Sequence, residues 1–118
     1  MTDERRRAEQ PEDLARFFVA RANAGDAEGL AALYETDAVL AFPSGQVTVG
    51  REAIRAAYER FLATKPQLAL GQQVPTLRNG DLALTATRLP SGDATTEVAR
   101  RQPDGTWLWV LDRPSFVG

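Results

Sequence analysis

The sequence predicts a single α+β domain, with helices in the first half of the chain and an antiparallel sheet built mainly from the second half. Apolar residues before Pro66 recur every three or four positions, as on one face of a helix. After Pro66 they alternate with small or polar residues, and turns rich in Gly and Pro separate the runs. This order of elements favours helices packed on one face of a curved sheet.

Three helices are expected before Pro66. The first begins at Pro11, where two acidic residues follow and suit the positive end of the helix dipole, and it ends at Gly25. Asp26 is a good N-cap for a short second helix, and the third follows Gly50 and is stopped by Thr64-Lys65-Pro66. The apolar faces of the three are, in order, Leu14, Phe17, Phe18 and Ala22; Leu30, Leu33 and Tyr34; and Ile54, Ala57, Tyr58, Phe61 and Leu62.

The strands are expected in two groups. A small hairpin, 38–42 and 46–49 around Pro43-Ser44-Gly45, lies between the second and third helices. The long group follows Pro66, with a strand at 68–74 and another at 82–86 joined by a hairpin turn at Asn79-Gly80. Turns at 90–92 and 103–105 mark two further strands.

The charge balance argues against nucleic acid as a partner. Fourteen basic and sixteen acidic residues give a net charge of −2, and no basic run is long enough to follow a row of phosphates. The cluster Arg5-Arg6-Arg7 is flanked by acids and predicts a solvated, partly disordered tail over residues 1–10. The domain is then expected to cover residues 11–118.

The chain has no cysteine and no histidine. The usual zinc and iron ligands are therefore missing, as are the Ser-His-Asp and Cys-His arrangements, and we expect neither metal nor cofactor. Acid–base chemistry would have to use carboxylates, Lys, Tyr or Arg. The sequence also lacks a signal peptide and an apolar run of membrane-spanning length, so we expect a cytoplasmic protein with no membrane partner.

Several motifs resemble one superfamily. Asn23-Ala24-Gly25-Asp26 and Gly50-Arg51-Glu52-Ala53-Ile54 are similar to the N-terminal half of ketosteroid isomerase-like and SnoaL-like proteins, and Pro103-Asp104-Gly105-Thr106-Trp107 is similar to their last hairpin. The resemblance, to the nuclear-transport-factor-2-like (NTF2-like) superfamily, covers residues 11–115. It implies a cone in which three N-terminal helices pack on a curved mixed or antiparallel sheet and enclose a pocket for a small apolar molecule. It also implies a homodimer through the outer face of the sheet.

The resemblance does not extend to the catalytic residues of ketosteroid isomerase. That enzyme uses an aspartate base and an oxyanion hole of a tyrosine and a protonated aspartate. The tyrosine position falls on Phe18 and the base position on Phe42, and a phenyl ring neither takes nor donates a proton. Only the third position keeps a carboxyl, at Glu97. We therefore expect no ketosteroid isomerase activity by that mechanism.

Asp112 and Glu97 are the two candidate catalytic residues. Asp112 ends an apolar strand, in the region where a SnoaL-type cyclase, by resemblance, carries an acid–base aspartate. If the last turn pairs Gln102 with Gly105, Glu97 shares a face with Asp112; a loop one residue longer puts Glu97 on the opposite face from Asp112, with Trp109 and Leu111. The register of the last hairpin therefore decides the chemistry.

Both carboxyls also have structural interpretations. Glu97 is suited to a surface ion pair with Arg88 or Arg100, and Asp112 to a turn hydrogen bond or a pair with Arg113. A carboxyl buried in a pocket would instead have a raised pKa, which suits acid–base catalysis near neutral pH.

Five aromatic residues are candidates for a ligand-binding wall: Phe18, Phe42, Tyr58, Trp107 and Trp109. Tyr34 and Tyr58 lie on predicted helix faces, which favours packing with a satisfied hydroxyl over catalysis. The two tryptophans share one strand face, which favours the core or a dimer interface over stacking on a ligand.

Two functions remain open at this point. The first is a small-molecule-binding SnoaL-like protein acting as a cofactor-independent isomerase, cyclase or hydrolase-type enzyme on an apolar carbonyl compound, through Asp112 or Glu97. The second is a non-catalytic ligand carrier or protein-association module. An open pocket with a buried carboxyl would favour the first, and a cavity filled by the protein's own side chains would favour the second.

Overall fold

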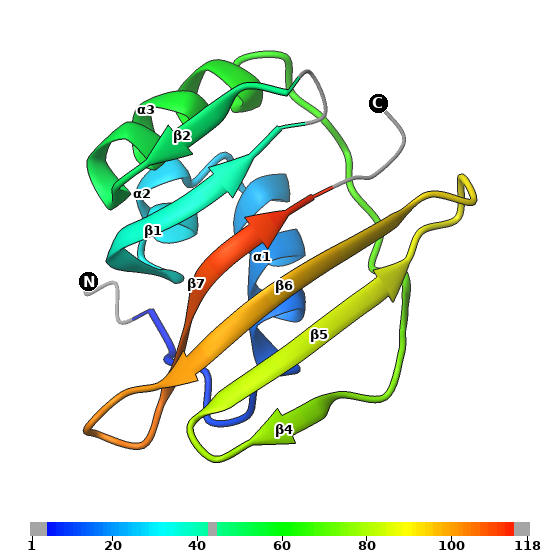
Figure 1. Cartoon of the computed structure of the whole chain (residues 1–118). Coiled ribbons are helices and arrows are strands. Elements are labelled where there is room, and N and C mark those ends of the chain that lie inside the picture. Colours follow the sequence, from blue (N-terminus) through cyan, green and yellow to red (C-terminus); the bar gives the residue numbers. More distant parts are fainter. Residues whose placement is uncertain (1–4, 43–44, 115–118) are drawn as a thin grey trace.

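A computed structural model describes residues 5–42 and 45–114, in which helices cover one face of a twisted sheet (Figure 1). The helices are α1 (Asp13–Asn23), α2 (Ala27–Ala31) and α3 (Arg51–Leu62); the strands are β1 (Tyr34–Ala41), β2 (Val47–Val49), β3 (Gln72–Gln73), β4 (Leu77–Asn79), β5 (Leu82–Arg88), β6 (Ala94–Arg101) and β7 (Trp107–Arg113). The strand order is β2-β1-β7-β6-β5-β3, and β4 pairs with the other end of β5. All pairs are antiparallel except β1 with β7. The predicted α+β fold is confirmed.

The helices form where capping and apolar spacing predict them. The Asp26 side chain accepts a hydrogen bond of 2.9 Å from the backbone N–H of Gly29, which caps α2. On α3, Ile54, Tyr58 and Leu62 are buried at four-residue intervals against the sheet. None of the helices in the described ranges has the length and apolarity needed to cross a bilayer.

Tyr34 lies on a strand, not on the second helix as its spacing suggested. Helix α2 ends at Ala31, and β1 begins at Tyr34, four residues before the strand predicted at 38–42. Hydrogen bonds to the sheet determine the conformation here, although the spacing fits a helix. The Trp109 N–H donates to the Leu33 carbonyl at 2.8 Å, and Tyr34 pairs with Trp109 in the parallel β1–β7 ladder.

The strand predicted at 68–74 is mostly unpaired. Only Gln72–Gln73 joins the sheet, against the end of β5. The preceding stretch is held by α1 instead, because the Asn23 amide donates to the Leu68 carbonyl at 2.9 Å and accepts from the Leu68 N–H at 2.8 Å. The alternating Leu68 and Leu70 thus belong to an extended segment beside the helices.

Residues 5–10 are packed on the domain, and the solvated tail predicted for residues 1–10 is wrong for this part. Ala8 is buried, and its carbonyl accepts from the Trp107 N–H at 2.9 Å, just beyond the point where β1 stops pairing with β7. The Arg5 guanidinium forms a two-pronged ion pair with Asp26. Residues 1–4, most of the predicted turn at 43–45 and residues 115–118 lie outside the described residues.

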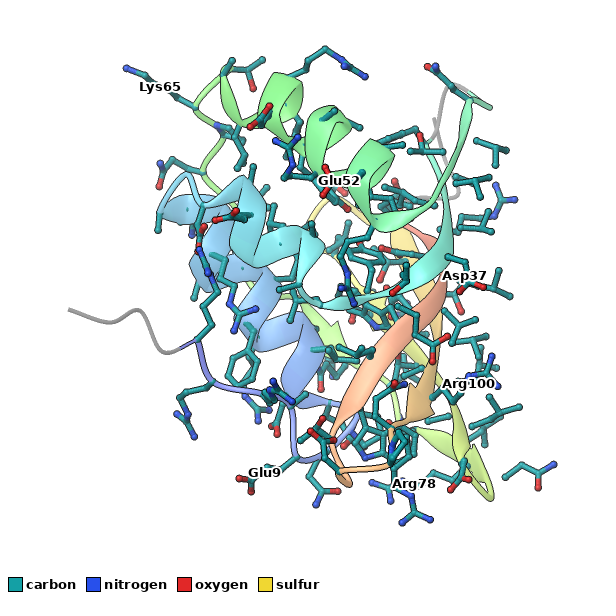
Figure 2. All side chains as sticks on the ribbon, turned by 90° about the vertical axis from the view of Figure 1, so that its left-hand side faces the viewer. Glu9, Asp37, Glu52, Lys65, Arg78 and Arg100 are labelled. Atoms are coloured by element: carbon teal, nitrogen blue, oxygen red, sulfur yellow. The ribbon has the colours of Figure 1, made fainter. Side chains whose placement is uncertain are left out.

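The core lies between the helices and the inner face of the sheet. Leu14, Leu30, Leu40 and Ile54 are fully buried there. Figure 2 labels six charged side chains, all of which are exposed: Glu9, Asp37, Glu52, Lys65, Arg78 and Arg100. Charged side chains are rarely buried, because an ionised group without a partner is costly to remove from water. Glu97 and Asp112 are exceptions, since both are buried on the inner face of the sheet.

Candidate functional site

A pocket of about 420 Å³ lies between α1, α3 and the inner face of the sheet at the end of β6 and β7. Its wall is apolar for the most part, with Phe18, Val19, Phe42, Tyr58, Phe61, Leu68, Leu70, Leu89 and Trp109 among the lining residues. Four lining residues of the sheet carry polar groups: Thr87, Thr95, Glu97 and Asp112. A concave apolar wall with a few converging polar groups is typical of a small-molecule site.

Residues 68–71 close one side of this pocket, and a glycine lets them approach the sheet. A Cβ built on Gly71 would lie 2.3 Å from the Arg88 carbonyl oxygen, which no side chain tolerates. The chain therefore crosses the end of β5 closely at this point.

Glu97 and Asp112 lie directly opposite each other on β6 and β7. Near the turn, Gln102 pairs with Thr106 and Ala99 with Trp109, which is the longer loop that would separate the two carboxyls. A β-bulge at Val110 then inserts one residue into β7 and shifts the register. Neither sequence-based alternative included this bulge, which restores the pairing of Glu97 with Asp112 and points both inward.

Both carboxyls are buried, with 6% of each residue exposed. Glu97 accepts a hydrogen bond of 2.6 Å from the Thr85 hydroxyl, and Asp112 accepts one of 2.5 Å from the Tyr34 hydroxyl. Within residues 5–42 and 45–114 neither forms a salt bridge, so the predicted alternatives of an ion pair with Arg88, Arg100 or Arg113 are wrong. Arg100 pairs with Glu35 at 3.0 Å instead.

Burial raises the pKa of both groups. The pKa of Asp112 lies well above its ordinary value, chiefly because burial disfavours the charged form and also because of the nearby Glu97 charge; the Tyr34 hydrogen bond opposes the shift. The pKa of Glu97 is also raised by burial, against the opposing hydrogen bonds from Thr85 and Thr95. Two carboxyls that share an apolar site do not ionise independently, and the pair favours the state with one proton.

Two buried tyrosines extend this cluster. The Tyr34 hydroxyl lies 2.8 Å from the Tyr58 hydroxyl, so Asp112, Tyr34 and Tyr58 form a continuous chain of oxygens. Burial, followed by the charge of Asp112, raises the pKa of both tyrosines well above the ordinary value, so both keep their protons. The predicted satisfied hydroxyls are confirmed, but their link to Asp112 was not foreseen.

The part of the chain that the structure describes contains no group of three or more carboxylate, His or Cys side chains that could hold a metal ion. The polar groups of the lining residues are carboxyl and hydroxyl groups together with the indole N–H of Trp109.

Comparison with known proteins identifies the family. A model of the SnoaL-like domain matches residues 14–112. The chain belongs to the SnoaL-like domain family. A search of curated proteins finds no match to this SnoaL-like domain.

Solved structures similar to this SnoaL-like domain share its fold. An NTF2-like protein with a cystatin-like fold from Novosphingobium aromaticivorans is 25% identical, with a TM-score of 0.70 over 86% of this chain and 75% of that one. A ketosteroid isomerase-like protein from Erwinia carotovora atroseptica is 19% identical, with a TM-score of 0.73 over 86% and 89%. A protein of unknown function from Nostoc punctiforme is 18% identical, with a TM-score of 0.74 over 87% and 85%. These similarities support the NTF2-like superfamily.

In this SnoaL-like domain, the five aromatic candidates separate into two groups. Phe18, Phe42, Tyr58 and Trp109 line the pocket. Trp107 is not among the lining residues of this pocket and lies two residues before Trp109 on β7. The Arg78 guanidinium lies 5.4 Å from the centroid of its ring, and Ala8 pairs with Trp107. The extra pairing of β7 with the N-terminal segment covers Trp107, which the sequence pattern of β7 alone did not indicate.

Sequence reasoning missed three contributors to the site of this SnoaL-like domain. Thr85 and Tyr34 hold the carboxyls, and the segment 68–71 forms a wall. The alternation of Ala83, Thr85 and Thr87 on β5 was the available signal for Thr85, because the three share one face and only one face can be buried. No local signal marked Tyr34, whose role depends on the distant Asp112.

Proposed function

We propose that this SnoaL-like domain binds a small apolar carbonyl compound and moves a proton between its atoms without a cofactor, with Glu97 as base and Asp112 as the proton store. One observation carries the proposal: two opposed, buried carboxyls lie on the wall of a largely apolar pocket, and neither forms a salt bridge within residues 5–42 and 45–114. Isomerase and cyclase reactions both need such a proton transfer next to a carbonyl group.

The assignment of roles follows from the hydrogen-bond partners of the two carboxyls. The Thr85 hydroxyl donates to Glu97, which suits a carboxylate, whereas Asp112 is joined through Tyr34 to Tyr58 and can pass a proton along these oxygens. When the pair holds one proton, we therefore assign it to Asp112 and treat Glu97 as the carboxylate. A carboxylate in an apolar pocket is a stronger base than one in water, because burial raises its pKa. Glu97 can then take a proton from the carbon beside the carbonyl, while the proton held by Asp112 stabilises the negative charge that develops on the carbonyl oxygen.

The proposal predicts exchange of hydrogens with solvent. In D₂O, the protein should speed incorporation of deuterium next to the carbonyl of bicyclic ketones such as 2-tetralone, and nuclear magnetic resonance (NMR) follows the loss of the proton signal. The double variant Glu97→Gln/Asp112→Asn is the control and should return the rate to that of buffer. Exchange that the wild-type protein does not accelerate, for any ketone that it binds, would contradict the catalytic role.

Ligand carriage is the second candidate, favoured by the pocket's volume. About 420 Å³ lies within the range of small-molecule sites, and the protein's own side chains do not fill it. Binding of a ketone without accelerated exchange would support carriage in place of catalysis.

We also propose that two copies associate through the outer face of the sheet. Six aliphatic residues form one continuous cross-strand row there, each paired with the next across the strands: Leu77, Leu84, Val98, Leu111, Val39 and Val49. Most are exposed in the single chain, and apolar surface of this extent is unusual in a monomer. A two-fold axis lays such a row against itself.

Light scattering is therefore expected to report twice the 12.9 kDa chain mass at micromolar concentration. Leu84→Lys places a charge in the middle of the apolar row and should shift the protein to the monomer. Ala53→Lys, on the exposed side of α3, is the matched control and should leave the dimer intact. A wild-type mass equal to that of one chain would contradict this proposal.

A further inference from the structure

The oxygen chain Asp112–Tyr34–Tyr58 begins and ends at the pocket. Asp112 and Tyr58 both line the pocket, whereas Tyr34 is fully buried behind its wall and joins them through contacts of 2.5 and 2.8 Å. Tyr34 donates to Asp112 with its single proton, so Tyr58 must donate to Tyr34. In this arrangement the oxygen of Tyr58 has no proton left for a ligand.

The direction of the chain can reverse when Asp112 is protonated. A carboxylic acid can donate to Tyr34, Tyr34 then donates to Tyr58, and the proton of Tyr58 becomes available in the pocket. A ligand oxygen beside Tyr58 stabilises the reversed chain, because every proton then has an acceptor. Among the described residues, the Tyr34 hydroxyl is the only hydrogen-bond partner of the Tyr58 hydroxyl, so nothing else competes for that proton.

The surroundings of Tyr58 fix its position. Its ring packs against the rings of Phe18, Phe42 and Phe61, whose centroids lie 5.6, 6.2 and 6.5 Å away. It comes from α3, whereas Glu97 comes from the sheet. A base and a hydrogen-bond donor that act on neighbouring atoms of one ligand are thus supplied from different walls.

We propose that Tyr58 hydrogen-bonds the carbonyl oxygen of the ligand and that Asp112, acting through Tyr34, determines whether Tyr58 donates. This inference rests on the proposed function, whose ligand it positions. Tyr58 is the group that contacts the substrate, and Tyr34 is a positioning residue.

The proton balance of the step closes within the cluster. The Glu97 carboxylate takes the proton from the carbon, the C–H electron pair forms the C=C bond, and the carbonyl π pair moves onto oxygen. That oxygen takes the proton of Tyr58, Tyr58 takes that of Tyr34, and Tyr34 takes that of Asp112. The products are an enol, neutral Glu97 and ionised Asp112, so the net charge is unchanged. Because burial raises the pKa of both tyrosines, neither ionises as an isolated step.

The groups around Asp112 define what titrates with it. Glu97 faces it from β6, Tyr34 from β1 and Tyr58 from α3, while α1 contributes the uncharged Phe18 to the same pocket. Both tyrosines keep their protons over the neutral range, so a change in the donor strength of Tyr58 reports on the carboxyl pair.

The test uses 2-tetralone labelled with ¹³C at its carbonyl, bound to the protein and followed by NMR over a pH range. A hydrogen bond to the carbonyl moves its resonance downfield. In the wild-type protein the resonance should lie downfield at low pH and move upfield as pH rises through the pKa of Asp112. In Tyr34→Phe, Tyr58 is separated from Asp112, and the resonance should no longer depend on pH. Glu59→Gln, on the exposed side of α3 and outside the pocket, should keep the wild-type curve.

Tyr58→Phe gives the second, independent measurement. Its resonance should lie upfield at every pH, and 2-tetralone should bind about 5-fold more weakly, as for the loss of one neutral hydrogen bond. A wild-type pH curve in Tyr34→Phe, or a downfield resonance in Tyr58→Phe, overturns the inference while exchange by Glu97 still stands. Failure of the wild-type protein to bind any of the ketones overturns the proposed function and this inference with it.

Discussion

Replacing Glu97 by glutamine is expected to slow deuterium exchange into 2-tetralone by about 100-fold or more. The amide keeps the shape of the side chain and can still pair with the Thr85 hydroxyl, but it cannot take a proton. Exchange rates measured by NMR at saturating ketone separate this loss from weaker binding. Asp112→Asn should slow exchange by a similar factor, because it removes the proton that serves the ligand oxygen.

Glu59→Gln is the matched control for this result. This variant makes the same change of carboxyl to amide on the exposed side of α3, where Glu59 pairs with Arg55. Exchange in this variant should equal that of the wild-type protein. Full activity in Glu97→Gln, with circular dichroism confirming the fold, would remove Glu97 as the base.

The stability of the protein is expected to fall as pH rises above the unfolded carboxyl pKa of about 4 and through the raised pKa values of Glu97 and Asp112. A carboxyl whose pKa is raised by folding binds more protons in the folded state than in the unfolded state. Its contribution is therefore fully present below the unfolded pKa of about 4 and is lost as pH rises through the folded pKa. Asp112 and Glu97 both have raised pKa values, so they act in the same direction.

Asp112→Asn should flatten this decline, since each unit by which the pKa of Asp112 is raised corresponds to about 1.4 kcal/mol at high pH. Urea midpoints measured across the range provide the comparison. Asp26 and Asp104 have lowered pKa values and act in the opposite direction, but their contribution is complete above the unfolded pKa. A wild-type midpoint that does not change over this range would contradict the raised pKa of Asp112.

Local patterns in the sequence were sufficient for the helices and most turns. The cap at Asp26 and the stripe on α3 are properties of a few neighbouring residues, so they could be predicted without knowing the rest of the fold. The start of β1 could not, because Tyr34 fits a helix face locally and is drawn into the sheet by Trp109.

The candidate site was predictable in its residues but not in its geometry. Glu97 and Asp112 could be selected because both are carboxyls at positions where the resemblance to ketosteroid isomerase and SnoaL-type cyclases implies an acid–base residue. Whether they meet depends on the bulge at Val110, which no local turn or alternation reveals. The oxygen chain Asp112–Tyr34–Tyr58 depends in turn on the parallel pairing of β1 with β7. This pairing brings together Tyr34 and Asp112, which are more than seventy positions apart in the sequence.

The bulge at Val110 has a consequence for insertions and deletions in this strand. One extra residue turns Asp112 toward the pocket and, by the same half-turn of the backbone, turns Leu111 toward the outer row. A chain lacking Val110 would keep both orientations, because a regular ladder would then still pair Leu111 with Val98 and Asp112 with Glu97. One further residue inserted after Val110 would exchange the two, with a leucine facing Glu97 and an aspartate on the outer face. The acid pair inside and the apolar row outside would therefore be lost together by a single three-nucleotide insertion, although no residue of either would have been changed, and both would survive the loss of Val110.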